Sequence, residues 1–137
     1  MMIKLKLNKN MNFNAITDSS HIISIDASKE NGGKNKGPRP TELLLVGMAG
    51  CTAFDLKSYF DKKKIKFKKF HICISAQRKK KMPTVFKKIF IEYKIQTDRK
   101  NKSKIQSKIK YSLNKQCSCC VMLGKSAKVE YKLSIIK

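Results

Sequence analysis

The sequence predicts an α+β domain in which antiparallel sheets pack around one long buried helix. Three observations lead to this fold class. Apolar and polar residues alternate near both ends of the chain and in its middle, which is typical of half-buried strands. A helical segment beginning at Thr41 is apolar on nearly every face from Leu43 to Phe54, as in a buried helix. The order strands, helix, hairpin, helices, strand favours antiparallel sheets. We therefore expect a single domain over residues 1–137.

The N-terminal region predicts three short strands. Alternation puts Leu5 and Leu7 on one face of a half-buried strand over residues 2–7. A weaker strand pattern follows over residues 11–16. After a turn rich in Asp and Ser, a third strand over residues 21–26 completes a hairpin.

The central region predicts one long loop and then the buried helix. Residues 27–40 are polar and interrupted by glycine and proline, and long loops in compact domains tend to be functional. Thr41 directly follows a proline, at a position where it would cap the helix N-terminus. Glu42 suits the positive end of the helix dipole. The helix should end among the lysines at 62–64.

The C-terminal half predicts a hairpin, a helical region and a final strand. The hairpin strands cover residues 70–78 and 85–96, joined by a lysine-rich turn. Apolar residues then recur at helical spacing, and a short cysteine-rich segment follows over residues 117–124. The helical positions are Ile105, Ile109 and Leu113, and the last strand alternates through Val129, Tyr131, Leu133 and Ile135.

The charge is strongly positive, but its composition argues against base recognition. The chain has 32 Lys and Arg against nine Asp and Glu, for a net charge of +23. Only Arg39, Arg78 and Arg99 are arginines, and base-reading proteins favour arginine because its planar fork pairs with guanine. Lys, Ile and Asn are all encoded by A/T-rich codons, so a genome drifting toward A and T would enrich lysine at solvated surface positions. We expect at most weak, non-specific nucleic-acid binding that salt abolishes.

Hydropathy and cysteine content indicate a cytoplasmic protein with reduced thiols. No apolar stretch approaches the 18 or so residues of a membrane span, and the alternating N-terminus is unlike a secretory signal. Five cysteines is an odd number, so a disulfide here would be catalytic or transient rather than structural.

Two cysteine positions raise a question of chemistry. Cys51 lies within the apolar helix, where it is either a small buried hydrophobe or a thiol that needs a nearby cation to form a thiolate. Cys117, Cys119 and Cys120 form a CSCC cluster whose spacing matches no paired zinc motif. We therefore expect no metal and no cofactor. The role of Cys73, which shares a predicted strand face with a histidine, stays open, as do those of the other cluster cysteines.

Three segments resemble one known family. Residues 37–45 read GPRPTELLL, residues 49–53 read AGCTA, and residues 115–118 read KQCS. Together they resemble the OsmC/Ohr family, the osmotically inducible and organic-hydroperoxide-resistance proteins, and the strand order agrees over nearly the whole chain. The GPxPxELLL and KxCS forms resemble the YhfA-like branch more than the Ohr enzymes.

The resemblance implies a fold, a dimer and a reaction. The fold would be an intertwined homodimer in which each long helix packs against sheets shared across the interface. Cys51 would be the peroxidatic cysteine and Cys117 the resolving cysteine. The substrate would be an organic hydroperoxide, and a cellular dithiol would reduce the resulting disulfide. Cys119 and Cys120 should point away from the direction of Cys117, so Cys117 should dominate.

Two further site residues follow from the same resemblance. The Ohr enzymes place a Glu directly after the helix-opening proline, where this chain has Thr41 followed by Glu42. They also use an early arginine to activate the thiol, and Arg39 is the nearby arginine here. We expect Arg39 and Glu42 to complete the catalytic set. One alternative is a non-enzymatic OsmC-fold protein whose apolar pocket, lined by Cys51, holds a small ligand; another is a basic protein associated with nucleic acid.

Overall fold

The computed structural model describes residues 1–136 and is divided into two compact units. The first unit covers residues 1–44, and the second begins at Leu45. Each unit has its own three-stranded sheet. The mixture of sheets and separate helices confirms the predicted α+β class. The expectation that the whole chain is one domain stays a prediction.

The first unit is built on an antiparallel sheet with strand order β1-β2-β3. Its strands are β1 (Lys4–Lys9), β2 (Asn12–Ile16) and β3 (Ile22–Ile25), close to the ranges that alternation predicted. Leu5 pairs with Ala15, and Leu7 pairs with Phe13. Since directly opposed residues point to the same side of a sheet, one face is apolar throughout. We call this the first apolar face; it consists of Leu5, Leu7, Phe13, Ala15, Ile23 and Ile25.

The long loop of the first unit is organised by one carboxylate. Asp26 is 3% exposed, and its oxygens accept hydrogen bonds from the backbone N–H groups of Ala27, Lys34 and Lys36 at 2.8, 3.2 and 3.0 Å. The short 3-10 helix η1 (Lys29–Asn31) lies within the same loop. These bonds satisfy backbone donors that would otherwise lack partners.

Helix α1 (Pro40–Lys62) begins one residue earlier than predicted. Pro40 occupies the first helical position, where its missing N–H costs nothing. Arg39 is therefore the capping residue, and Thr41 is not. The carboxylate of Glu42 accepts the backbone N–H of Arg39 at 2.8 Å, as the third residue of a capping box does.

The prediction that α1 is buried on every face is wrong for the single chain. One stripe is buried, with four residues at successive turns: Met48, Thr52, Leu56 and Phe60. Val46 and Phe54 are 63% and 76% exposed. A helix that is apolar on every face is typically buried all round, but within the single chain only one stripe of α1 has packing partners.

The second sheet has strand order β4-β5-β6 and is mixed rather than antiparallel. Strands β4 (Phe67–Arg78) and β5 (Phe86–Thr97) form the predicted antiparallel hairpin, but β5 and β6 (Lys128–Ile136) are parallel. The expectation of antiparallel sheets is corrected here. The chain between β5 and β6 is a helical crossover, which returns it to the same end of the sheet before the last strand begins.

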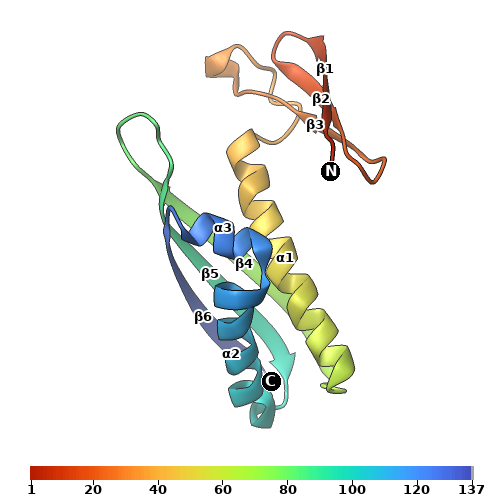
Figure 1. Ribbon diagram of the computed structural model, residues 1–137, viewed down its shortest axis with the longest axis vertical. Coiled ribbons are helices and arrows are strands. Elements are labelled where there is room, and N and C mark those ends of the chain that lie inside the picture. The colour runs from red at the N-terminus through yellow and green to blue at the C-terminus, as the bar shows by residue number, and fades with distance from the viewer. Residues whose placement is uncertain (137) are drawn as a thin grey trace. The chain divides into compact units, whose positions relative to one another are not determined.

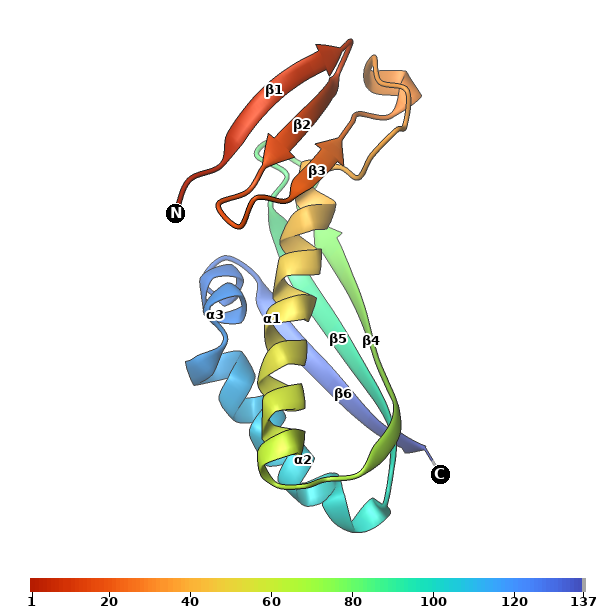
Figure 2. The ribbon, with the colours of Figure 1, turned by 90° about the vertical axis from the view of Figure 1, so that its right-hand side faces the viewer.

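Helices cover one face of the second sheet and leave the other face open. The crossover contains η2 (Arg99–Asn101), α2 (Lys102–Tyr111), the π-helical turn η3 (Ser112–Gln116) and α3 (Ser118–Gly124). Figures 1 and 2 show these helices on the same side of the sheet as α1. There the fully buried β5 residues Ile89, Ile91, Tyr93 and Ile95 form the core with Met48, Leu56, Phe60, Ile105 and Ile109.

Helix α1 has the length and apolar composition of a membrane-crossing helix, the one such helix among residues 1–136. The core helix of a soluble protein has the same properties, and Met48, Leu56 and Phe60 of α1 pack within the core of the second unit. The absence of a membrane span stays a prediction.

Candidate thiol site

Two cysteines that are far apart in the sequence lie side by side in the second unit. Cys51 is half-buried on α1, one residue before the buried Thr52. Cys117 is fully buried at the N-terminal cap of α3. Burial, followed by interactions with the Cys120 and Cys51 thiols, raises the pKa of Cys117 far above its usual range. The structure therefore brings together the two cysteines that the resemblance paired.

Two more thiols complete the cluster. Burial raises the pKa of Cys119, and so does its interaction with the Cys51 thiol. Cys120 is 1% exposed, and burial raises the pKa of its thiol to about 11. The Cys120 Sγ lies 3.9 Å from the carbonyl oxygen of Met48 on α1. We call Cys51, Cys117, Cys119 and Cys120 the thiol cluster.

The expectation that Cys119 and Cys120 point away from Cys117 is wrong for Cys120, whose thiol interacts with that of Cys117, whereas the Cys119 thiol interacts with that of Cys51. A Cβ placed on Gly47 would lie 3.9 Å from the Cys119 Sγ, and Gly47 is one turn before Cys51. The Cys119 sulfur thus lies against α1 near Gly47, at the distance of an ordinary van der Waals contact. Spacing within α3 alone does not reveal this contact, because it depends on where the second helix lies.

The segment that carries Cys117 is fixed by a π-turn. The backbone N–H of Cys117 donates to the carbonyl of Ser112 at 2.8 Å, which closes η3. The Cys117 Sγ accepts the backbone N–H of Cys120 at 3.3 Å and so caps α3. Such π-turns are frequent at functional sites. Here the turn ends one helix and directs Cys117 toward α1.

A buried chain of hydroxyls links that turn to α1 and β5. The Ser112 Oγ is 2.7 Å from the Asp55 carboxylate and 3.1 Å from the Thr52 Oγ1, which in turn is 2.9 Å from the Tyr93 hydroxyl. The carboxylate can only accept, so the Ser112 proton points to Asp55. The Ser112 hydroxyl is also placed to donate to Thr52, and in the contact between Thr52 and Tyr93 either hydroxyl can donate. Burial raises the pKa of Tyr93, so its hydroxyl stays protonated at neutral pH.

Arg39 and Glu42 belong to the first unit, whereas Cys51 and Cys117 belong to the second. The Arg39 guanidinium donates to the Gly37 carbonyl and to the Asn35 Oδ1, both at 2.9 Å. Together with the Glu42 cap, these bonds hold the end of the loop and the start of α1. The roles of Arg39 and Glu42 in catalysis stay predictions.

Cys73 lies apart from the thiol cluster. It is exposed on β4, opposite Glu92 of β5. This is the face of the second sheet that the helices leave open, and His71 lies on the same face, as alternation predicts. Ion pairs of Lys94 with Glu92 and of Lys88 with Glu130 border it, so this face is solvated.

Within residues 1–136, no three His, Cys, Asp or Glu side chains are placed to hold a metal ion. The expectation that the protein uses no metal or cofactor stays a prediction.

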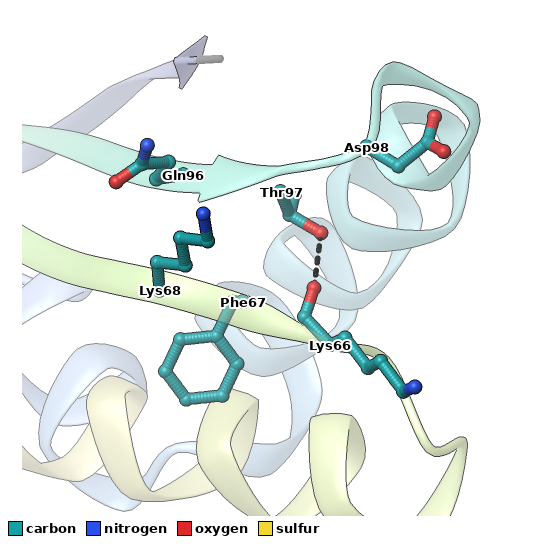
Figure 3. A pocket seen from close by; sticks show the side chains of 6 residues that line it. All are labelled: Lys66, Phe67, Lys68, Gln96, Thr97 and Asp98. Atoms are coloured by element: carbon teal, nitrogen blue, oxygen red, sulfur yellow. Dashed lines mark hydrogen bonds between the residues drawn. The ribbon is translucent and has the colours of Figure 1, made fainter.

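Two pockets of the second unit are lined by residues outside the thiol cluster. One pocket of about 290 Å³ opens where β4 begins and β5 ends, between Lys66, Lys68 and Asp98. The Thr97 hydroxyl there donates to the Lys66 carbonyl at 2.6 Å. Figure 3 marks this bond with a dashed line. Another of about 610 Å³ lies at the lysine-rich hairpin tip. No cysteine of the cluster lines either pocket.

Sequence reasoning missed the hydroxyl chain and the contact of Cys119. One signal was present for Thr52, because it continues the spacing of the buried Met48 and Leu56, and a hydroxyl on a buried helix stripe requires a polar partner. Ser112 and Tyr93 carry no comparable signal.

Comparison with known proteins identifies a family that matches most of the chain. A family model described as OsmC-like protein matches residues 33–132. Protein YhfA of Escherichia coli K12 is 23% identical over 136 residues, covering 99% of this chain and 98% of that protein.

Solved structures show the same fold. An OsmC-like protein from Mycoplasma pneumoniae is 20% identical with a TM-score of 0.82, covering 99% of this chain and 96% of that one. The organic hydroperoxide resistance protein OhrB of Bacillus subtilis is 16% identical with a TM-score of 0.61, covering 98% of each chain. Since the family match extends over most of the sequence, the chain belongs to the OsmC-like protein family.

Proposed function

We propose that this protein reduces organic hydroperoxides with thiols, using Cys51 as the peroxidatic cysteine and Cys117 as the resolving cysteine. The observation that carries the proposal is the meeting of these two thiols, one on α1 and one at the cap of α3. Membership of the OsmC-like family and a fold shared with an organic hydroperoxide resistance protein support it.

Accessibility assigns the two roles. Cys51 is half-buried, so a small hydroperoxide can reach its sulfur, whereas Cys117 is 0% exposed. A peroxidatic thiol must meet substrate, and a resolving thiol needs only to meet the oxidised first thiol. Burial also keeps Cys117 protonated, which leaves it inert toward peroxide.

The proposed reaction has three steps. The Cys51 thiolate attacks the terminal oxygen of the hydroperoxide, the O–O bond breaks, and the alkoxide takes a proton to leave as the alcohol. Cys51 is now a sulfenic acid. The Cys117 sulfur attacks the Cys51 sulfur, the S–OH bond breaks, and water leaves with the thiol proton. A cellular dithiol then reduces the disulfide and becomes oxidised itself.

Two features of the second unit prepare this reaction. The π-turn and the chain Ser112–Thr52–Tyr93 hold the segment of Cys117 against α1. Because α3 spans only Ser118–Gly124, the segment can shift slightly to reach disulfide geometry, in which the two Cα atoms lie within roughly 7 Å.

Activation of Cys51 is assigned in this proposal to Arg39, of the same chain or of a partner chain. Cys51 lies several turns into α1, beyond the reach of the helix dipole, so its thiolate needs a separate cation. In Arg39→Met the rate of thiol alkylation at Cys51 should fall at neutral pH, whereas Arg78→Met should leave it unchanged. Equal alkylation rates in all three proteins would remove Arg39 from the mechanism.

We also propose that the working form is a homodimer. Val46 and Phe54 leave apolar surface on α1 uncovered, and the first apolar face leaves Leu5 and Leu7 more than half exposed. A second copy of the chain offers the same apolar surfaces, as a symmetric interface requires. Sedimentation at micromolar concentration should show a dimer.

The function is tested by hydroperoxide consumption with a dithiol reductant. Wild type should consume cumene hydroperoxide, Cys51→Ser should consume none above background, and Cys73→Ser should match wild type. Peptide mapping after one equivalent of peroxide should show a Cys51–Cys117 disulfide. Inert thiols, together with tight binding of a small apolar ligand, would instead support a non-enzymatic binding protein.

A further inference from the structure

A second thiol of the same helix lies next to Cys51. Burial raises the pKa of the Cys119 thiol most strongly, and an interaction with the Cys51 thiol raises it further. The Cys119 Sγ is 3.9 Å from the position a Cβ would take on Gly47, one turn before Cys51. Cys119 therefore lies on the same surface of α1 as Cys51, with its sulfur close to Gly47.

The thiols of Cys117 and Cys119 differ in what can reach them. Cys117 is fully buried, and its sulfur also accepts the N–H of Cys120. Cys119 is only half-buried, as is Cys51. A disulfide between Cys51 and Cys117 would thus have one sulfur closed to any reductant, whereas a disulfide between Cys51 and Cys119 would have two sulfurs near the surface.

We propose that Cys119 is a second disulfide partner of Cys51, and that the oxidised site passes its disulfide from Cys117 to Cys119 before a dithiol reduces it. The inference rests on the proposed peroxidase function and assigns a further catalytic residue to it.

The exchange is a balanced thiol–disulfide reaction. The Cys119 thiolate attacks the Cys51 sulfur of the Cys51–Cys117 disulfide, the bond to Cys117 breaks, and Cys117 takes up the proton that Cys119 lost. A dithiol reductant then attacks the Cys119 sulfur and releases the Cys51 thiolate. Its second thiol attacks the mixed disulfide, frees Cys119 and leaves the reductant as a disulfide. Two electrons pass from reductant to protein.

The other cysteines are less suited to this step. Cys120 is 1% exposed, and its sulfur faces the carbonyl of Met48. Cys73 lies on the open face of the second sheet, on the opposite side from α3. Cys73→Ser is therefore a matched control, since it removes an exposed thiol without touching the cluster.

Peptide mapping after oxidation is the first test. In Cys117→Ser, one equivalent of cumene hydroperoxide should give a Cys51–Cys119 disulfide. In Cys117→Ser/Cys119→Ser it should give a Cys51 sulfenic acid that dimedone traps. If Cys117→Ser alone accumulates the dimedone adduct and forms no disulfide, Cys119 is not a partner of Cys51.

The second test measures reduction. Oxidised Cys119→Ser should still carry the Cys51–Cys117 disulfide, but a dithiol such as dihydrolipoamide should reduce it about tenfold more slowly than in wild type, because only the Cys51 sulfur of that disulfide lies near the surface. Oxidised Cys73→Ser should be reduced at the wild-type rate. Equal rates for wild type and Cys119→Ser would overturn the transfer step.

A peroxide-free test separates the two proposals. One equivalent of Ellman's reagent should label Cys51 in Cys117→Ser/Cys73→Ser as a mixed disulfide and release one equivalent of chromophore, and attack by Cys119 on that mixed disulfide should then release a second equivalent. That release should be lost when Cys119 is also changed to Ser. If the second equivalent of chromophore is released but wild type does not react with hydroperoxide, the proposed peroxidase function is wrong and Cys119 is still a disulfide partner of Cys51. If hydroperoxide oxidises wild type but no second equivalent of chromophore is released, the peroxidase function is supported and Cys119 is not a partner of Cys51.

Discussion

The two sheets of this chain have similar apolar alternation but are covered very differently. In the second sheet, Ile89 and Ile91 are fully buried because helices pack over their face. In the first sheet, Leu5 and Leu7 alternate just as regularly and are 56% and 52% exposed. Alternation therefore shows which residues share a face, and it does not show what covers that face. The second unit covers its own core, whereas the first apolar face keeps Leu5 and Leu7 exposed.

The largest effect on stability should come from shortening a buried side chain of the second sheet. Ile91→Ala removes a side chain with no exposed surface, so the free energy of unfolding should fall by about 2–5 kcal/mol. Chemical denaturation of the wild type and the variant measures this. A loss below about 1 kcal/mol would mean that the helices do not hold this face closed.

A charge on the first apolar face should weaken the dimer instead. Leu5→Asp places a carboxylate on the first apolar face, and covering it would forfeit about 1.5–3 kcal/mol of burial per chain. The dimer should dissociate in sedimentation experiments at concentrations where wild type stays dimeric. Lys6→Asp, on the opposite face of β1, is the matched control and should leave the dimer intact. Equal behaviour of both variants would exclude this face from the interface.

Within the second unit, Ser112 links the π-turn to α1. Ser112→Ala removes a buried donor to Asp55 and a partner of Thr52, so stability should fall by about 1–3 kcal/mol. Formation of the Cys51–Cys117 disulfide should also slow, because the turn is less firmly held. Ser126→Ala, which removes an exposed hydroxyl bonded to the Leu123 carbonyl, should change neither property. An unchanged rate in Ser112→Ala would limit the hydroxyl chain to a structural role.

A helical glycine can report on which side of α1 a second chain lies. A Cβ on Gly50 would meet nothing within 4 Å in the single chain. Gly50→Ala should therefore stabilise the protein by about 0.5–1 kcal/mol through helix propensity. Thermal unfolding measures the gain. A weaker dimer in this variant would instead place Gly50 at the interface.

The smallest expected effect is local and depends on pH. The backbone N–H of Lys36, with those of Ala27 and Lys34, lowers the pKa of the Asp26 carboxyl. Its contribution to stability is complete above the unfolded pKa of about 3.9 and is lost as pH falls through the lower folded value. Hydrogen exchange at Lys34 and Lys36 should accelerate in that acidic range before the second unit unfolds. Asp26→Asn should show fast exchange of both amides already at neutral pH.

The sequence by itself determined the elements, the fold class and the two cysteines worth pairing. Period-two alternation and a long apolar helix are local properties, so the strands and α1 could be located within a few residues. The motifs around Cys51 and Cys117 are likewise local. They indicated the OsmC-like family, which the family match confirms.

Only the tertiary structure decided what these elements touch. The parallel pairing of β5 with β6, the single buried stripe of α1, and the contact of Cys119 with Cys51 depend on where a helical crossover places its chain. The same holds for the chain from Tyr93 to Asp55, whose members come from β5, α1 and η3. A hydrogen bond or a thiol contact acts over a few ångströms, so residues distant in the sequence acquire a shared chemistry only when packing brings their atoms together.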